Sequence, residues 1–241
     1  MPEKIGDALK KAIARERAEE DFKEKRGEES LLMNPTRLEI FQYLCKNPCS
    51  KLRTIAKELG LAVPTADWHL RKLTSKGLIS TKTVGKNKVF YPAEMIDPND
   101  IEVLTLLSGD KARLICSTIA DNLGITQSEL GKKLGMYQQE IGWYTSKLTE
   151  KGVLSRVKDG RFRRFYINDN LEDVLHSNRK RRGHFKKILM KFLRNDGAKP
   201  EIIRSRGDTL VIQIGAGKEK TILKVNLRLI PWLFQKEKNV L

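Results

Sequence analysis

The feature of this sequence that most constrains its fold is an internal duplication. Residues 68–78 return, with substitutions, as residues 143–153, an offset of 75 residues. The same offset relates a longer unit, residues 28–92, to residues 103–167. Two copies are too few for a solenoid of stacked repeats, so the duplication predicts two domains of one kind.

The charge of the chain indicates what kind of partner it binds. The 241 residues hold 47 Lys and Arg against 30 Asp and Glu, a net charge of +17. Residues 1–33 are nearly balanced, with 8 basic and 9 acidic side chains, whereas residues 34–167 hold 22 and 13 and residues 168–241 hold 17 and 8. A polyanion is the partner that such an excess favours, and the duplicated units and the C-terminal third should carry the basic surfaces.

Several classes of function have no support in the sequence. No run of about 18 apolar residues could form a membrane span, and the N-terminus lacks the apolar core of a secretory signal. The three cysteines, Cys45, Cys49 and Cys116, cannot form a closed disulfide set, and two thiols near one helix end without a histidine make a poor zinc site. No catalytic constellation stands out among the few histidines. We expect a cytoplasmic protein that is not an enzyme and needs no cofactor or metal.

The first unit predicts three helices and a hairpin. Asn34 can cap a helix that has a proline in its first turn, and Ser50 can cap a second helix that Gly60 ends. A third helix should run from about residue 64 to 76. The hydrophobic period then changes from about 3.6 to 2, which predicts a hairpin, or wing, with a basic tip.

The second unit follows the same plan after a short helix at residues 101–107. Its three helices are expected at residues 111–123, from a capping box at Thr126 to Gly135, and at residues 138–151. Its wing should span residues 153–167 and turn at Asp159-Gly160, a strong hairpin dipeptide.

The two ends of the chain are less regular. Residues 4–29 alternate charges at helical spacing and predict a solvated charged helix, because a dimerising coiled coil needs more apolar heptads than they supply. Residues 171–194 predict a helix with a break at Gly183, and residues 179–194 are basic and amphipathic, suited to nucleic acid, an anionic membrane or a partner protein. The last 44 residues predict a small sheet that docks on the preceding helix or pairs with a second subunit.

The expected fold class is therefore α+β, mainly α with small β-hairpins: two tandem winged helix-turn-helix domains plus a small C-terminal α/β extension. The expected domains are a charged N-terminal helix or tail (1–29), winged helix 1 (30–96), winged helix 2 (97–168), a basic helical segment (169–197) and a small β-rich C-terminal region (198–241).

Three motifs of the first unit resemble a known family. They are Asn34-Pro35-Thr36-Arg37-Leu38-x-Ile40, the helix over residues 52–60, and His69-Leu70-x-x-Leu73-x-x-x-Gly77-Leu78-Ile79. Together they resemble the ArsR-type winged-helix transcription regulators of bacteria and archaea, over about 60 residues well and over a second 60 less well. The resemblance implies that the third helix enters the DNA major groove. Many family members sense metal through a Cys-x-Cys pair, and residues 51–61 contain no cysteine, so metal sensing of that type is not expected.

Helical periodicity identifies the candidate DNA-binding residues independently. Ala66, Leu70 and Leu73 form the core face of the third helix, so the opposite face is available to read bases. The reader candidates are Thr65, Trp68, Arg71 and Lys72 in the first unit and Gln138, Gln139, Trp143 and Lys147 in the second. The wing candidates are Lys86, Lys88, Arg161, Arg163 and Arg164. The auxiliary nucleic-acid-binding candidates are Arg179, Lys180, Arg181, Arg182, Lys186 and Lys187. The two tryptophans could instead wedge between the third helix and the wing, and His69 is better explained by packing.

These features predict a sequence-specific regulator of transcription that binds double-stranded DNA. Because Arg71-Lys72 corresponds to Ser146-Lys147 in the second unit, the readers differ and the operator should be asymmetric. Two alternatives remain open: an adaptor that docks on the basal transcription machinery, and an RNA-binding protein that uses residues 179–194. A homodimer through the N-terminal helix or the C-terminal region is also possible, and no membrane partner is expected.

Overall fold

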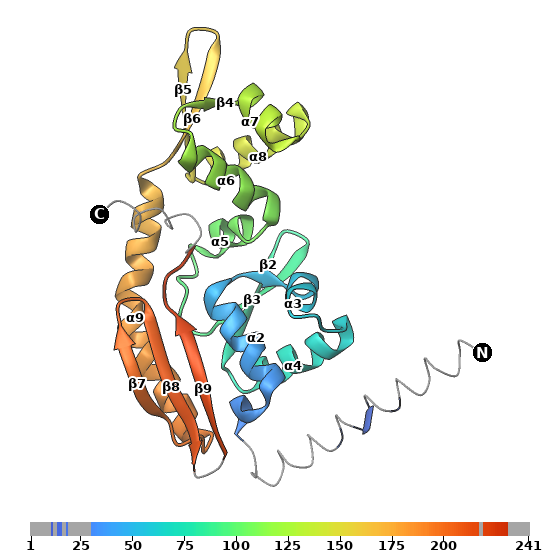
Figure 1. Cartoon of the computed structure of the whole chain (residues 1–241), viewed down its shortest axis with the longest axis vertical. Helices are drawn as coiled ribbons and strands as arrows, with labels where there is room; N and C mark the ends of the chain where they lie inside the picture. The colour runs from blue at the N-terminus through green and yellow to red at the C-terminus, as the bar shows by residue number, and fades with distance from the viewer. Residues whose placement is uncertain (1–10, 12–13, 16–17, 19–29, 217–218, 231–241) are drawn as a thin grey trace, which may run out of the picture.

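The computed structural model describes residues 11, 14, 15, 18, 30–216 and 219–230, and for residues 170, 172–179 and 216 it describes the backbone alone. The protein is an elongated α+β molecule in which the two duplicated units lie one above the other along the long axis (Figure 1). The charged helix expected at residues 4–29 lies outside the described residues, apart from four helical positions.

The first set of elements contains the three helices and the hairpin expected from the sequence. In order, they are η1 (Leu31–Met33), α2 (Pro35–Lys46), β1 (Ser50–Lys51), α3 (Leu52–Glu58), α4 (Val63–Ser75), β2 (Ile79–Val84) and β3 (Asn87–Pro92). The strands form an antiparallel sheet in the order β1-β3-β2. Asn34 Oδ1 accepts a hydrogen bond from the amide of Arg37 at 3.0 Å, which confirms the predicted cap of α2.

The predicted cap at Ser50 is wrong. Ser50 lies in β1, where it pairs with Phe90, and its Oγ donates a hydrogen bond to the carbonyl of Asn47 at 2.7 Å. Lys51 holds the N-cap position of α3 instead, without a side-chain cap. The serine hydroxyl is thus used to close the turn after α2, an alternative that short polar side chains offer to the backbone.

The second set of elements repeats this order after α5 (Ile101–Leu107). It contains α6 (Asp110–Asp121), β4 (Ile125–Thr126), α7 (Gln127–Leu134), α8 (Gln138–Glu150), β5 (Leu154–Asp159) and β6 (Phe162–Ile167), and its sheet order is β4-β6-β5. The capping box between Thr126 and Glu129 is present, and Gly135 adopts the left-handed conformation, φ 62°, that ends α7. Both features confirm the sequence prediction.

The C-terminal third is one long helix and one sheet. The helix α9 (Asn170–Asn195) is followed by β7 (Glu201–Arg206), β8 (Thr209–Ala216) and β9 (Glu219–Asn226), which form an antiparallel sheet in the order β7-β8-β9. The predicted break at Gly183 is wrong, because α9 is continuous through it. Gly183 is exposed, and the cost of a helical glycine, about 1 kcal/mol, is small beside the packing of the helix on the sheet.

The sheet is covered by α9, as expected, and also docks on the first unit, which was not expected. Phe185, Leu189 and Leu193 of α9 are buried in the same core as the inward-facing residues of β8 and β9. Strand β9 lies beside α2 (Figure 1), and the amide of Lys224 donates a hydrogen bond to Gln42 Oε1 at 3.3 Å. The C-terminal third therefore joins the second unit, from which α9 emerges, to the first.

A carboxylate at the end of α9 closes this connection. Asp196 Oδ2 accepts hydrogen bonds from Ser30 Oγ and from the amide of Leu31, both at 2.6 Å. Leu31 opens η1 and is fully buried. The end of α9 is thus anchored to the beginning of the first unit, and we refer to these two bonds as the Asp196 clasp.

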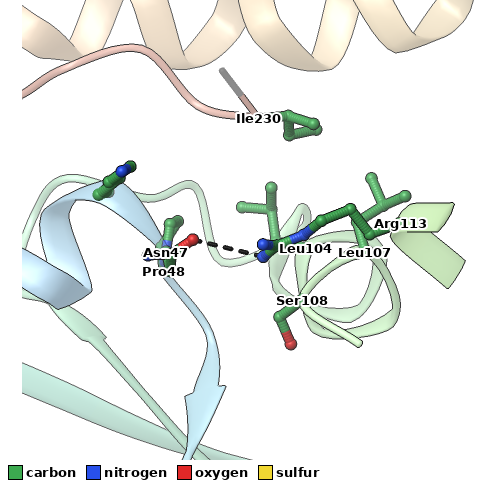
Figure 2. Close-up of a pocket in the computed structure, with 8 residues that line it drawn as sticks. Asn47, Pro48, Leu104, Leu107, Ser108, Arg113 and Ile230 are labelled. Atoms are coloured by element: carbon green, nitrogen blue, oxygen red, sulfur yellow. Dashed lines mark hydrogen bonds between the residues drawn. The ribbon is translucent and has the colours of Figure 1, made fainter. Parts of the chain in front are cut away.

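The two units also meet directly. Arg113 of α6 donates from Nη2 to Asn47 Oδ1 at 3.3 Å, and Ser108 Oγ donates to the carbonyl of Cys49 at 3.3 Å. Figure 2 shows the first of these bonds beside Leu104, Leu107 and Ile230, around a cavity of only about 20 Å³. The junction is therefore bridged by two hydrogen bonds, and the two units cannot rotate about it without breaking them.

The Asp196 clasp gives the first prediction. Asp196→Ala removes the acceptor of two charge-assisted bonds, so we expect a loss of about 1–3 kcal/mol and a melting temperature about 2–10 °C lower. Thermal unfolding of the full chain measures it. Glu39→Ala on the exposed face of α2 is the control and should change stability by about 0.5 kcal/mol or less. Equal melting temperatures for the two variants would show that the clasp does not hold the C-terminal third in place.

Candidate nucleic-acid interface

The outer face of α4 carries the first group of candidate residues. Ala66, Leu70 and Leu73 are fully buried, as the periodicity predicted, so the opposite side of the helix faces outward. Arg71 lies there with 78% of its side chain exposed and forms an ion pair with Asp67 at 2.7 Å. An exposed i, i+4 pair of this kind is weak, so the guanidinium can exchange it for another acceptor at little cost.

The other α4 candidates surround Trp68. The Trp68 ring is half-buried and meets His69 edge to face, with ring centroids 4.7 Å apart, while Lys72 Nζ lies 5.5 Å from its centroid. His69 is 5% exposed, in agreement with a packing role. Thr65 is half-buried one turn earlier. The half-buried Trp68 ring therefore packs beneath the outer surface of α4, and the Lys72 side chain extends over that ring.

The outer face of α8 carries a different set. Gln138 and Gln139 lie exposed in its first turn, and Trp143 is 55% exposed with an edge-to-face contact to Tyr144, 4.8 Å between ring centroids. Lys147 forms an exposed ion pair with Glu150 at 2.7 Å. Trp143 is thus much more open to solvent than Trp68, so the wedge interpretation suits the first tryptophan better than the second.

Gln138 is also part of the contact between α7 and α8. Its carbonyl accepts a hydrogen bond from Gln127 Nε2 at 2.9 Å, and its side chain lies so close to Gly131 that a Cβ at that position would clash with it. Gln139, which is exposed and has neither of these contacts, is the better candidate for reading bases.

Four of the five wing candidates are exposed, and the fifth, Arg164, is partly buried and bonded within the fold. Lys86 and Lys88 lie at the tip of the first wing, and Arg161 and Arg163 lie in the second. Arg164 instead donates from Nε to Asp159 Oδ2 at 2.6 Å and from Nη1 to the carbonyl of Gly124 at 3.0 Å. Arg164 thus links the wing to the turn before β4.

The basic residues of α9 divide into two groups. Arg181 pairs with Asp97 at 2.9 Å, Arg182 pairs with Asp208, and Lys186 donates to Ser205 Oγ at 3.0 Å. These three therefore hold α9 to the linker and to the sheet. Lys180 and Lys187 are exposed, and the side chains of Arg179 and His176 lie outside the described residues.

Sequence reasoning missed two further exposed basic residues in the second wing. Arg156 and Lys158 lie in β5, and Lys158 pairs across the ladder with Arg163. The sequence signal that could have identified them is their spacing of two residues, which places both side chains on one face of the strand. With Arg161, they make the second wing more basic than the first.

The described residues show no metal or thiol site. No group of three or more His, Cys, Asp or Glu side chains in the described parts of the chain could hold a metal ion. Cys45, Cys49 and Cys116 are buried and unpaired, and burial raises the pKa of the Cys49 and Cys116 thiols to about 12. In the same described ranges, no helix is both long enough and apolar enough to cross a bilayer.

Two short helices joined by a tight turn and followed by a hairpin define a class, the winged helix-turn-helix. Residues 33–80 match the family model described as winged helix-turn-helix DNA-binding. An uncharacterized HTH-type transcriptional regulator of Methanocaldococcus jannaschii is 30% identical over 144 residues, 60% of this chain and 36% of that protein. The chain thus contains a winged helix-turn-helix DNA-binding domain and is homologous to a transcriptional regulator, of which it spans little more than a third.

Solved structures with partial similarity include two from bacteria. Reduced HlyU from Vibrio cholerae is 15% identical, covers 34% of this chain and 82% of its own, and has a TM-score of 0.29. A homodimeric winged helix-turn-helix domain from Mycobacterium bovis, described as a possible ArsR-family regulator, is 25% identical, covers 32% of this chain and 68% of its own, and has a TM-score of 0.25.

The buried thiols give the second prediction. Because burial raises their pKa far above neutrality and removes them from solvent, the native protein should react with less than about 0.1 equivalent of a water-soluble disulfide reagent at pH 8 within minutes. After unfolding in guanidinium, all three cysteines should react. Rapid reaction of one equivalent of thiol in the native protein would contradict this prediction, because it would show that one of the cysteines is accessible to solvent.

Proposed function

We propose that this protein is a transcription regulator that binds one duplex sequence-specifically through two unlike winged-helix units. The observation that carries the proposal is the repeated element order, in which α4 and α8 occupy equivalent positions and each turns a polar face outward. The proposed units are residues 30–96 and 97–168, and residues 169–197 and 198–241 form the helix and sheet that join them.

In this proposal α4 and α8 enter adjacent major grooves. Arg71 can fork onto guanine O6 and N7, and Gln139 onto adenine N6 and N7, each contact contributing about 1–3 kcal/mol of discrimination. The wings contact phosphates through Lys86 and Lys88 on one side and Arg161 and Arg163 on the other. We assign Arg164 a structural role rather than a DNA contact, because its Nε and Nη1 donate to Asp159 and to the carbonyl of Gly124.

The unlike faces have a consequence for the target. A dimer of identical subunits reads two identical half-sites, whereas this chain offers Arg71 and Lys72 to one half-site and Gln139 and Lys147 to the other. We therefore propose an asymmetric operator bound by one chain. The homologue is described as a transcriptional regulator, and this description favours a regulator over an adaptor that docks on the basal transcription machinery.

The reader helices give the third prediction. After selection of bound duplexes from a random pool, Arg71→Ala and Lys147→Ala should each weaken binding to the selected site about 5- to 100-fold and relax the preference at different base pairs. Titration of a labelled duplex measures affinity, and reselection with each variant measures preference. Lys220→Ala and Arg204→Ala, exposed on the C-terminal sheet, are the controls and should bind like the parent. Selection that recovers no common sequence would contradict the proposal.

The hydrogen-bonded junction between the two units gives the fourth prediction. Because the two units are joined at Arg113 and again through α9, they should tolerate little change in half-site spacing. Inserting about 5 bp, half a turn, between the half-sites should reduce affinity at least about tenfold, since it places one half-site on the opposite face of the duplex. Gel-shift titration of a spacer series measures it, with base changes that keep the length as the control. Unchanged affinity with every spacer would contradict a fixed arrangement.

A further inference from the structure

Helix α9 presents a continuous basic face to solvent. Lys180, Lys187, Lys191 and Arg194 are all exposed. At 100° and 1.5 Å per residue these positions fall within about 60° of one another around the helix and extend over roughly 21 Å along it. We call these four residues the α9 basic face.

The opposite side of α9 is occupied. Phe185, Leu189 and Leu193 are buried against the sheet, and Arg181 and Arg182 turn inward to Asp97 and Asp208. No acidic side chain among the described residues pairs with any member of the α9 basic face. On this side of the helix, Glu94 Oε2 lies 3.8 Å from His184 Nε2. The basic residues of α9 therefore fall into two groups. Arg181 and Arg182 are paired with carboxylates inside the molecule, whereas the α9 basic face has no acidic partner among the described residues.

The α9 basic face lies far from the two readers. In Figure 1, α9 runs along one long side of the molecule behind β7 and β8, and α3, α4, α7 and α8 lie toward the other side, with β9 and α2 between α9 and α4 in this view. Packed layers of helix and sheet are about 10 Å thick, so roughly 30 Å separates the α9 basic face from the outer face of α4. A straight duplex about 20 Å wide that fills the reader surface does not extend to α9.

The chemistry of the face favours a phosphate backbone. Lysine ammonium groups are point charges that suit phosphates without reading bases, and a duplex carries about one negative charge per 1.7 Å of its axis. An anionic membrane is a poorer partner, because an interfacial helix inserts its apolar face into lipid and the apolar face of α9 is buried in the core.

We infer that the α9 basic face binds the backbone of a second DNA duplex, so that one chain bridges two DNA segments. The inference rests on the proposed function for the first segment alone. Contact with the second segment is independent of sequence. If all four residues neutralise phosphates, this contact should weaken about 10²-fold between 50 and 200 mM salt.

Capture of one duplex by another tests the inference with the full chain. A biotin-labelled duplex that carries the selected site is immobilised, the protein is bound, and a fluorescent duplex of unrelated sequence is added. The parent protein should retain the second duplex at low salt. The variant with Lys180→Gln, Lys187→Gln, Lys191→Gln and Arg194→Gln should bind the first duplex within about threefold of the parent but retain the second at least about tenfold less well.

The matched control changes the same number of exposed basic residues elsewhere. Lys199→Gln, Arg204→Gln, Arg206→Gln and Lys220→Gln lie on or beside the C-terminal sheet and should leave capture of the second duplex unchanged. Melting curves of both variants show whether the substitutions preserve the fold, since every changed side chain is solvent-exposed.

Several outcomes would overturn the inference. Equal capture by the parent and the α9 variant would do so, as would parallel losses of first-duplex and second-duplex binding, which would place α9 on the same segment as the readers. Preferential capture of a structured RNA through α9 would replace DNA as the partner. A chain with Arg71→Ala, Gln139→Ala and Lys147→Ala separates this inference from the proposed function. It should lose its preference for the selected site yet keep weak binding to any duplex through the wings and α9. Changing the α9 basic face as well should weaken that binding further without abolishing it, because the wings keep their basic side chains.

Discussion

The arrangement of the whole molecule depends on the return of the chain from its second unit to its first. Helix α9 leaves the wing of the second unit and ends at the Asp196 clasp, where one carboxylate binds Ser30 and the amide of Leu31. The units also touch at Arg113 and Asn47. The two bonds of the clasp together contribute only about 1–3 kcal/mol, yet attachment at two separate places prevents rotation about either one. The relative position of α4 and α8 is thus fixed in the free protein, and in the proposed function this lowers the entropic cost of binding both half-sites.

This arrangement divides the work of recognition among different surfaces. In the proposed function, the outer faces of α4 and α8 offer side chains that distinguish bases, whereas the wings and the α9 basic face offer charge that any sequence can neutralise. Several basic residues belong to neither group. Arg164, Arg181 and Arg182 contact the protein itself, and they keep a wing or α9 in place. The net charge of +17 therefore overstates the number of basic side chains that are free to bind a polyanion.

The helices and hairpins could be predicted from the sequence because local signals agree at each of them. Gly60, Gly77 and Gly135 adopt positive φ at the helix ends where the pattern placed them, and the Thr126 capping box has the expected bonds. The errors arose where a distant partner decides the outcome. Ser50 pairs with Phe90 in the β1-β3 ladder rather than capping α3, and Gly183 remains helical because α9 is packed on a sheet. The docking of β9 on α2 depends on contacts between residues about 180 positions apart, which no local pattern encodes.

The exposed faces of the candidate site could also be predicted from the sequence in part. Periodicity identified the outer face of α4 correctly, because Ala66, Leu70 and Leu73 form its buried side. It could not reveal that Gln138 is engaged against α7 or that Arg164 is engaged within the wing, since both depend on side chains from other elements.

The most direct test of the central claim is a hydroxyl-radical footprint of the full chain on its selected duplex, combined with sedimentation to count chains per duplex. The account predicts two protected patches of different pattern, about 34–36 Å apart on one face of the duplex, with a single chain bound. One protected patch, or two identical patches that require two chains, would contradict it.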